Sequence, residues 1–182
     1  MKATGIVRRI DDLGRVVVPK EIRKTLRIRE GDPLEIFTDR EGEIILKKYS
    51  PMGEMSAFAK QYANSLANVL GCTVCISDQD QIVAAAGTGR KELQDKSISK
   101  QLEGLMEARE QRVANVGEKN YINLTKEGEE DYANQVIVPI ISDSDVIGSV
   151  SILDKNEKRK FGEMEQKLAG CAANFLGSQM EQ

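Results

Sequence analysis

The N-terminal fold is decided by residues 2–26, which read KATGIVRRIDDLGRVVVPKEIRKTL. Thr4–Ile10 and Arg15–Val18 are rich in isoleucine and valine and are separated by the polar turn DDLG, so the pattern predicts two short strands. Pro19 fits the first position of a helix, where its missing N–H is harmless, and Lys20–Leu26 supplies that helix. The stretch therefore predicts a strand, a turn, a strand and a helix.

A second hairpin is expected directly afterwards. The segment Gly31–Pro33 interrupts the helix. Leu34–Thr38 and Glu43–Lys48 are then predicted as strands on either side of a turn at residues 39–42. Together these elements make residues 1–50 a small domain.

The first two predicted strands are apolar on both faces. Ile6 and Ile10 alternate with Val7, and Val16 alternates with Val17. A half-exposed sheet in a monomer would show one polar face, and a domain of this size buries only about 60% of its unfolded surface. Both difficulties disappear if two copies interleave their hairpins, so we predict an obligate dimer.

The chain of 182 residues has a net charge of −3, but this charge is unevenly distributed. Residues 1–29 hold nine basic and three acidic residues, a local charge of +6. Residues 51–182 hold 14 basic and 20 acidic residues, a charge of −6. A basic N-terminal part on an acidic remainder is expected when the first part contacts phosphate.

Residues 2–49 resemble the AbrB family of transition-state regulators, through the segment quoted above and the sequence GDPLEI at residues 31–36. The resemblance implies a swapped-hairpin β-barrel dimer that binds double-stranded DNA through basic residues on one face. At the corresponding positions this chain has Arg8, Arg15, Arg23 and Lys24. Lys24 stands where the family often has arginine, and lysine keeps the charge but lacks the bidentate fork.

Two neighbouring basic residues complete the predicted DNA-binding set, Lys2 and Arg9. Because they lie on the helix, Arg23 and Lys24 are expected to contact phosphates, whereas Arg8 and Arg15 on the strands are expected to reach into a groove. The resemblance also implies a loose sequence preference, read through DNA shape. The alternative is that these are solvated charges that keep exposed strands from aggregating.

Residues 51–182 are predicted to form a second, α+β domain. Ser50 and Pro51 open a helix as its N-cap and first-turn proline, and Gly71 ends it. The other expected elements are strands at Cys72–Ser77 and Gln81–Ala86, a helix at Ser97–Gln111, a short strand at Tyr121–Leu124, a hairpin of Gln135–Ser142 and Val146–Leu153, and a helix at Phe161–Met180. This order predicts an antiparallel sheet flanked by helices.

The sequence VIVPIISDSDVIGSVSI at residues 136–152 resembles the late hairpin of GAF domains, although PAS-like and other sensor sheets have such hairpins too. An AbrB-type head and a GAF-like body at this length are similar to a family of sporulation transcription regulators. The resemblance implies activation or repression of genes in the forespore. We also predict that the C-terminal domain assembles the homodimer further, to a homotetramer, and that it shifts DNA affinity in response to an unidentified small-molecule ligand.

The residue content argues against enzymes and cofactors. Without histidine the chain has no Ser-His-Asp or Cys-His pair and no imidazole metal ligand. Cys72 and Cys75 lie three apart on a predicted strand, so their sulfurs diverge, and only Cys171 remains, too few for a structural zinc. We therefore expect no metal, no cofactor and no catalytic site.

Phe161, Met164, Leu168, Cys171 and Phe175 form an apolar stripe at three- and four-residue spacing on the last helix. One interpretation is that the stripe faces the core of its own domain. The other is that it forms a helical seam between subunits. The two roles are compatible.

The expected compartment is the cytoplasm. An odd number of cysteines, three, argues against a disulfide framework. No apolar run is long enough to predict a membrane span, and no signal-peptide core follows Met1. Two other functions stay open: an antitoxin, because the same hairpin fold heads some toxin–antitoxin pairs, and a sensor whose basic head only dimerises.

Overall fold

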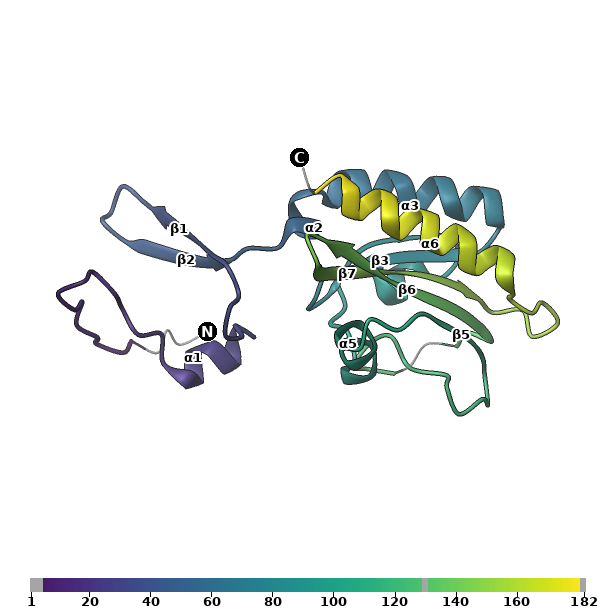
Figure 1. The fold of residues 1–182 in the computed structure, drawn as a ribbon, viewed down its shortest axis with the longest axis horizontal. Coiled ribbons are helices and arrows are strands. Elements are labelled where there is room, and N and C mark those ends of the chain that lie inside the picture. The colour runs from purple at the N-terminus through teal and green to yellow at the C-terminus, as the bar shows by residue number, and fades with distance from the viewer. Residues whose placement is uncertain (1–4, 129–130, 181–182) are drawn as a thin grey trace. The chain divides into compact units, whose positions relative to one another are not determined.

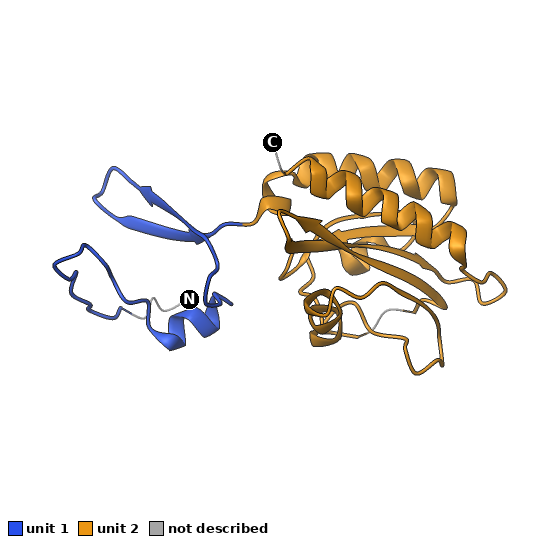
Figure 2. Cartoon of the chain, viewed as in Figure 1, with its two compact units in different colours: residues 1–49 blue, residues 50–182 orange. Residues whose placement is uncertain are grey.

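The computed structural model describes residues 5–128 and 131–180. The chain divides into two compact units, residues 1–49 and residues 50–182 (Figure 2).

Residues 5–49 of the first unit form one helix and one hairpin. Helix α1 (Lys20–Thr25) begins after Pro19. Strands β1 (Leu34–Thr38) and β2 (Ile44–Lys48) pair antiparallel, and the Asp39 carboxylate closes their turn by accepting the N–H groups of Glu41 and Glu43. The helix and the second hairpin predicted from the sequence are therefore present.

The two strands predicted around the first turn are not formed within one chain. Residues 5–10 and 15–18 have no strand assignment, while Thr4 lies outside the described residues. A strand exists only when its N–H and C=O groups meet a neighbouring strand. We call residues 5–10 and 15–18 the two arms of the turn. The two arms do not pair with each other as strands, and their residues Val7 and Val17 are 93% and 72% exposed.

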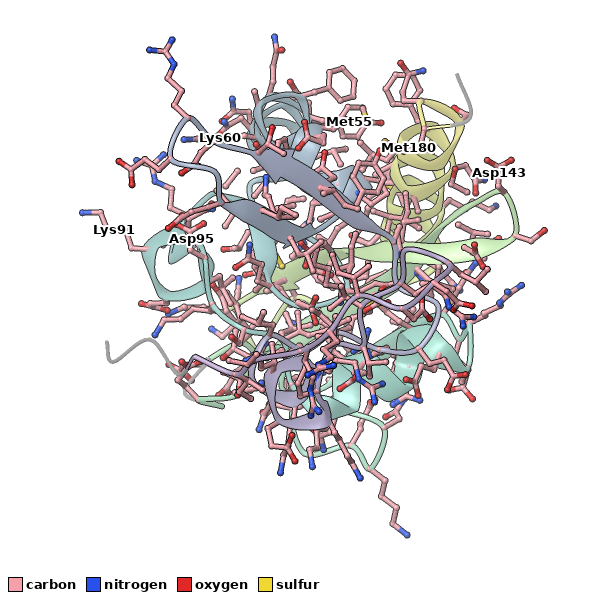
Figure 3. The ribbon with its side chains drawn as sticks, turned by 90° about the vertical axis from the view of Figure 1, so that its left-hand side faces the viewer. Met55, Lys60, Lys91, Asp95, Asp143 and Met180 are labelled. Carbon is pink, nitrogen blue, oxygen red and sulfur yellow. The ribbon has the colours of Figure 1, made fainter. Side chains whose placement is uncertain are left out.

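The second unit is built on a five-stranded antiparallel sheet in the order β4-β3-β7-β6-β5. Its strands are β3 (Thr73–Ser77), β4 (Ile82–Ala86), β5 (Arg112–Asn115), β6 (Asn134–Ser142) and β7 (Asp145–Asp154). Its helices are α2 (Pro51–Glu54), α3 (Ser56–Leu70), α4 (Arg90–Leu93), α5 (Lys100–Glu107) and α6 (Glu163–Ser178). The late hairpin, predicted from its Val-Pro-Ile and Ile-Gly strands, is the pair β6 and β7, with Asp143 at its projecting tip (Figure 3).

The sheet is covered on both faces, because α3 and α6 lie side by side on one face and α5 lies on the other (Figure 1). Small residues let the two helices approach the sheet, and the core beneath them includes Ala59, Ala63, Ala172, Ala173 and Leu176. The core beneath α5 includes Leu102, Leu105, Ile137 and Leu153. The observed fold confirms the predicted α+β class, with an antiparallel sheet and flanking helices.

Three local predictions differ from the structure. The first helix is interrupted at Met55, which separates α2 from α3. The helix predicted at Ser97–Gln111 is shorter, because Ser99 is its N-cap and it ends at Glu107. Residues 121–124 form a loop, and the additional strand is β5; it is a short edge strand whose Val113 C=O accepts the side chain of Asn120.

Gly177→Ala tests the close contact between α6 and β6. A Cβ at Gly177 would lie 2.1 Å from the carbonyl oxygen of Ile141, so we expect a loss of roughly 1–3 kcal/mol in the free energy of unfolding. The matched control is Gly104→Ala on α5, where nothing lies within 4 Å of the added Cβ. This control should gain up to about 1 kcal/mol from helix propensity. Denaturant unfolding of both variants measures the difference, and equal stabilities would contradict the packing.

Candidate nucleic-acid interface

The turn between the two unpaired arms is a closed loop of five residues. The N–H of Asp11 donates to the Arg15 carbonyl at 3.1 Å, and the N–H of Gly14 donates to the Asp11 carbonyl at 3.0 Å. Gly14 has φ +77°, a conformation that glycine adopts without strain. The Asp11 side chain completes the loop, because its Oδ1 accepts the N–H groups of Leu13 at 3.0 Å and Arg15 at 2.7 Å.

Arg15 is anchored at this turn but remains accessible. Its Nε donates to Asp11 Oδ2 at 2.7 Å, and its side chain is 70% exposed. The backbone N–H of Arg15, and after it the guanidinium, lower the pKa of the Asp11 carboxyl below its usual value. The carboxylate therefore stays ionised beside the arginine at neutral pH.

The other predicted residues lie on the same unit. Arg8 and Arg9 are exposed on the arm before the turn, and Arg23 and Lys24 occupy the last turn of α1, where Arg23 is partly exposed. None of these four side chains forms a salt bridge with any residue of 5–128 or 131–180. Lys2 lies outside the described residues.

Basic residues nearer the hairpin have a structural role instead. Lys48 Nζ lies 3.0 Å from Asp32 Oδ2 and also donates to the Arg27 carbonyl at 3.1 Å. The same Asp32 oxygen accepts the backbone N–H of Arg29 at 2.7 Å. The basic residues of the first unit thus include Lys48, which holds the loop and the hairpin together, and others that face solvent. Cationic side chains of the second kind are available to phosphate oxygens.

Sequence reasoning missed Asp11 as part of the site. An aspartate that opens a turn commonly accepts backbone N–H groups within the next few residues, so the DDLG motif did carry the signal. The ion pair with Arg15 adds a negative charge to a surface that was assigned basic residues alone.

The cysteines occupy separate environments. Cys72 packs in the core beneath α3 and α6, Cys75 packs beneath α5, and Cys171 is exposed. Burial raises the pKa of the Cys72 thiol to about 11, so it is protonated at neutral pH. No cluster of three or more potential metal ligands occurs among the residues that the structure describes.

The apolar stripe on α6 is divided: Phe161, which precedes the helix, and Leu168 pack against the core of the unit, whereas Met164, Cys171 and Phe175 are exposed. Met164 is 61% exposed and Phe175 is 40% exposed, whereas Ala169 and Leu176 are buried. The core-facing interpretation is therefore wrong for the exposed positions. The small neighbours of the stripe pack on the sheet, because they allow the close approach that large side chains would prevent.

An aromatic cluster joins α6 to α3 on this outer face. The Phe175 ring stacks on Tyr62 with centroids 5.4 Å apart and lies 5.9 Å from Phe58. Beside it, a groove of about 810 Å³ runs along α6 past Lys167, Cys171 and Asn174. Within the described ranges no helix is long and apolar enough to cross a bilayer.

Comparison with known proteins decides the family. Residues 54–181 match the family model described as "Stage V sporulation protein T C-terminal, transcription factor". The chain is 51% identical to stage V sporulation protein T of Bacillus subtilis (strain 168) over 182 residues, which is 100% of each chain. This chain belongs to the stage V sporulation protein T family.

The N-terminal unit of this family member has its own relatives. Over 51 residues it is 65% identical to the transition state regulatory protein AbrB of Bacillus subtilis (strain 168), a match that covers 28% of this chain and 52% of that protein. Residues 7–54 also match the model "Antidote-toxin recognition MazE, bacterial antitoxin". The AbrB-type head predicted from the sequence is confirmed.

The second unit of this stage V sporulation protein T relative has the GAF fold. The GAF domain of a phosphoenolpyruvate-protein phosphotransferase from Coxiella burnetii aligns with a TM-score of 0.57 and 18% identity, covering 69% of this chain and 82% of that chain. At this identity the likeness concerns the fold alone, and it confirms the predicted GAF-like architecture.

Proposed function

We propose that the chain regulates transcription by binding double-stranded DNA as a homodimer through residues 1–50, while residues 51–182 assemble and regulate it. The observation that carries this proposal is a set of exposed or partly exposed basic side chains, Arg8, Arg9, Arg23 and Lys24, that form no ion pair with the described residues, on a unit that is 65% identical to AbrB. The family places the action in sporulation, and the forespore is the compartment we infer.

The contacts follow from where the basic residues lie. Arg23 and Lys24 on α1 bind phosphates, and Arg8 and Arg15 reach into a groove, with Arg9 beside them. A two-fold dimer presents each residue twice, so Arg8, Arg15, Arg23 and Lys24 supply about eight contacts. By occupying or bending a promoter, the dimer activates or represses transcription from it.

The exposed arms support interleaving of two copies. Val7, Ile10 and Val17 are large apolar side chains on the surface of the single chain. A second copy brings the same arms, which then pair as strands and bury these side chains. The DNA-binding unit is therefore complete only in the dimer.

The outer face of α3 and α6 supports a second contact between copies. Phe58, Tyr62, Met164 and Phe175 place aromatic and apolar surface there, beside the groove along α6. Exposed apolar patches with a polar rim are typical of protein interfaces. Two head dimers joined through this face make a homotetramer.

In this proposal the second unit regulates DNA binding and catalyses no reaction. Among the described residues, the fully buried Gln135 has a side-chain oxygen, Oε1, without a hydrogen-bond partner, while its Nε2 donates to the Ile122 carbonyl at 3.2 Å. An antitoxin role is disfavoured because toxin-binding tails are short and flexible, whereas residues 50–182 form a compact unit.

The salt dependence of DNA affinity tests the proposed function. Fluorescence anisotropy with a labelled duplex should show affinity falling roughly 10³–10⁵-fold between 50 and 200 mM salt, because about eight contacts release counterions. Arg15→Ala and Arg23→Ala should bind more weakly, and each should give a shallower dependence of log affinity on log salt.

The matched control is Lys91→Ala, which removes a basic side chain that projects from the second unit (Figure 3). This variant should bind as the parent does. Salt-indifferent binding that no head variant alters would overturn the assignment and leave a dimerising sensor.

Phe175→Glu tests the assembly face. A carboxylate in the aromatic cluster should raise the tetramer–dimer dissociation constant by at least about tenfold, because it would be desolvated at the contact. Val116→Glu, at a residue that is 57% exposed on another part of the unit, is the control and should leave assembly unchanged. Sedimentation equilibrium gives the mass of the assembly that each variant forms. A tetramer in both variants, or a dimer in both, would refute the role of this face.

A further inference from the structure

Arg15 differs from the other proposed DNA contacts because it already has an anionic partner. Asp11 Oδ2 accepts its Nε at 2.7 Å. Among residues 5–128 and 131–180, the side chains of Arg8, Arg9, Arg23 and Lys24 form no ion pair. A carboxylate on a surface that binds phosphate repels the phosphate and lowers the affinity of the surface for DNA. The presence of Asp11 on this surface therefore requires a reason.

The Asp11 carboxylate is fixed more firmly than an ordinary surface ion pair. Its other oxygen, Oδ1, accepts two backbone N–H groups, from Leu13 at 3.0 Å and from Arg15 at 2.7 Å. The main chain on either side is closed by the bond from the Asp11 N–H to the Arg15 carbonyl. The carboxylate is thus part of the turn, and the arginine is held against it.

This arrangement restricts what the guanidinium group offers. The group is planar and carries five N–H donors, which bind in pairs along its edges. Asp11 occupies the Nε position and leaves the terminal Nη donors, the pair that fits the O6 and N7 atoms of guanine or two phosphate oxygens. Arg15 is held in one orientation instead of sweeping over the backbone of the duplex.

We propose that Asp11 is a positioning residue that orients Arg15 for a groove contact and weakens its binding to phosphate elsewhere. Asp11 thereby sets the ratio of selective to non-selective DNA affinity, a role that rests on the proposed function of the head. Each dimer contains two such pairs. The lowered pKa of the Asp11 carboxyl is consistent with a pair that stays ionised.

Asp11→Asn distinguishes the role of Asp11 in the ion pair from its role in the turn. The asparagine keeps a side-chain oxygen that can accept the backbone N–H groups of Leu13 and Arg15, and it removes the charge that holds the guanidinium. Asp12→Asn is the matched control, because it removes the same charge one residue away. No side-chain hydrogen bond or ion pair links Asp12 to the described part of the chain.

Two duplexes of equal length and composition serve as probes: one enriched by the intact protein from a random-sequence pool, and a scrambled version of it. Anisotropy at one salt concentration gives the affinity of each variant for both. Asp12→Asn should raise both affinities alike, because it only reduces repulsion. Asp11→Asn should raise the affinity for the scrambled duplex further and lower the ratio of the two affinities by about tenfold, the size of one lost base contact.

A double variant checks that the effect passes through the arginine. In an Arg15→Ala background, Asp11→Asn should behave as Asp12→Asn does, since no guanidinium remains to be positioned. Circular dichroism and thermal melting of each full-length variant confirm that the fold is kept. A loss of selectivity that persists in the Arg15→Ala background would overturn the proposal.

The failures of the two proposals are distinguishable. If Arg15→Ala weakens binding but Asp11→Asn and Asp12→Asn have the same ratio of affinities as the parent, Asp11 is a simple surface charge, and the positioning role is wrong while the DNA-binding function stands. If the parent protein enriches no sequence and binds without salt dependence, the proposed function itself fails.

Discussion

Within the described part of one chain, the two arms that flank the turn at Asp11–Arg15 have no strand to pair with. Their backbone N–H and C=O groups lack a ladder, and Val7 and Val17 present most of their surface to water. A second copy supplies the same arms, so one association event pairs the backbone and buries the valines. Two-fold symmetry also repeats every basic residue, which turns a small set of cations on one chain into a surface long enough to follow a duplex.

The basic residues of the head divide into two classes, and the division explains how so small a unit holds together and still binds DNA. Lys48 forms an ion pair with Asp32 and donates a hydrogen bond to the Arg27 carbonyl, where the loop meets the hairpin. Arg8, Arg9, Arg23 and Lys24 have no such partners among the described residues. Arg15 lies between these extremes, since it is exposed but oriented by Asp11. Affinity, on this account, comes from the unpaired cations, and selectivity from the oriented arginine.

Elements with a strong local signal were predictable from the sequence. The hairpin of β6 and β7 has long apolar strands and a tight turn, and α1 follows a proline, so both lie where the pattern places them. The short polar edge strand β5 and the single-turn helix α4 carry no such signal and depend on tertiary contacts. The stripe on α6 shows why periodicity alone misassigns a face: alanines pack on the sheet while Met164 and Phe175 face outward. For the site, family resemblance placed the basic residues, but only the three-dimensional turn brought Asp11 to Arg15.

Hydrogen–deuterium exchange of the intact protein tests the pairing of the arms most directly. If two copies interleave, the amides of residues 6–10 and 15–18 should exchange as slowly as those of β1 and β2, and their protection should fall on dilution below the dimer dissociation constant. Exchange of these amides at the rate of an unstructured peptide, while β1 and β2 remain protected, would contradict the swapped dimer and the DNA-binding surface that depends on it.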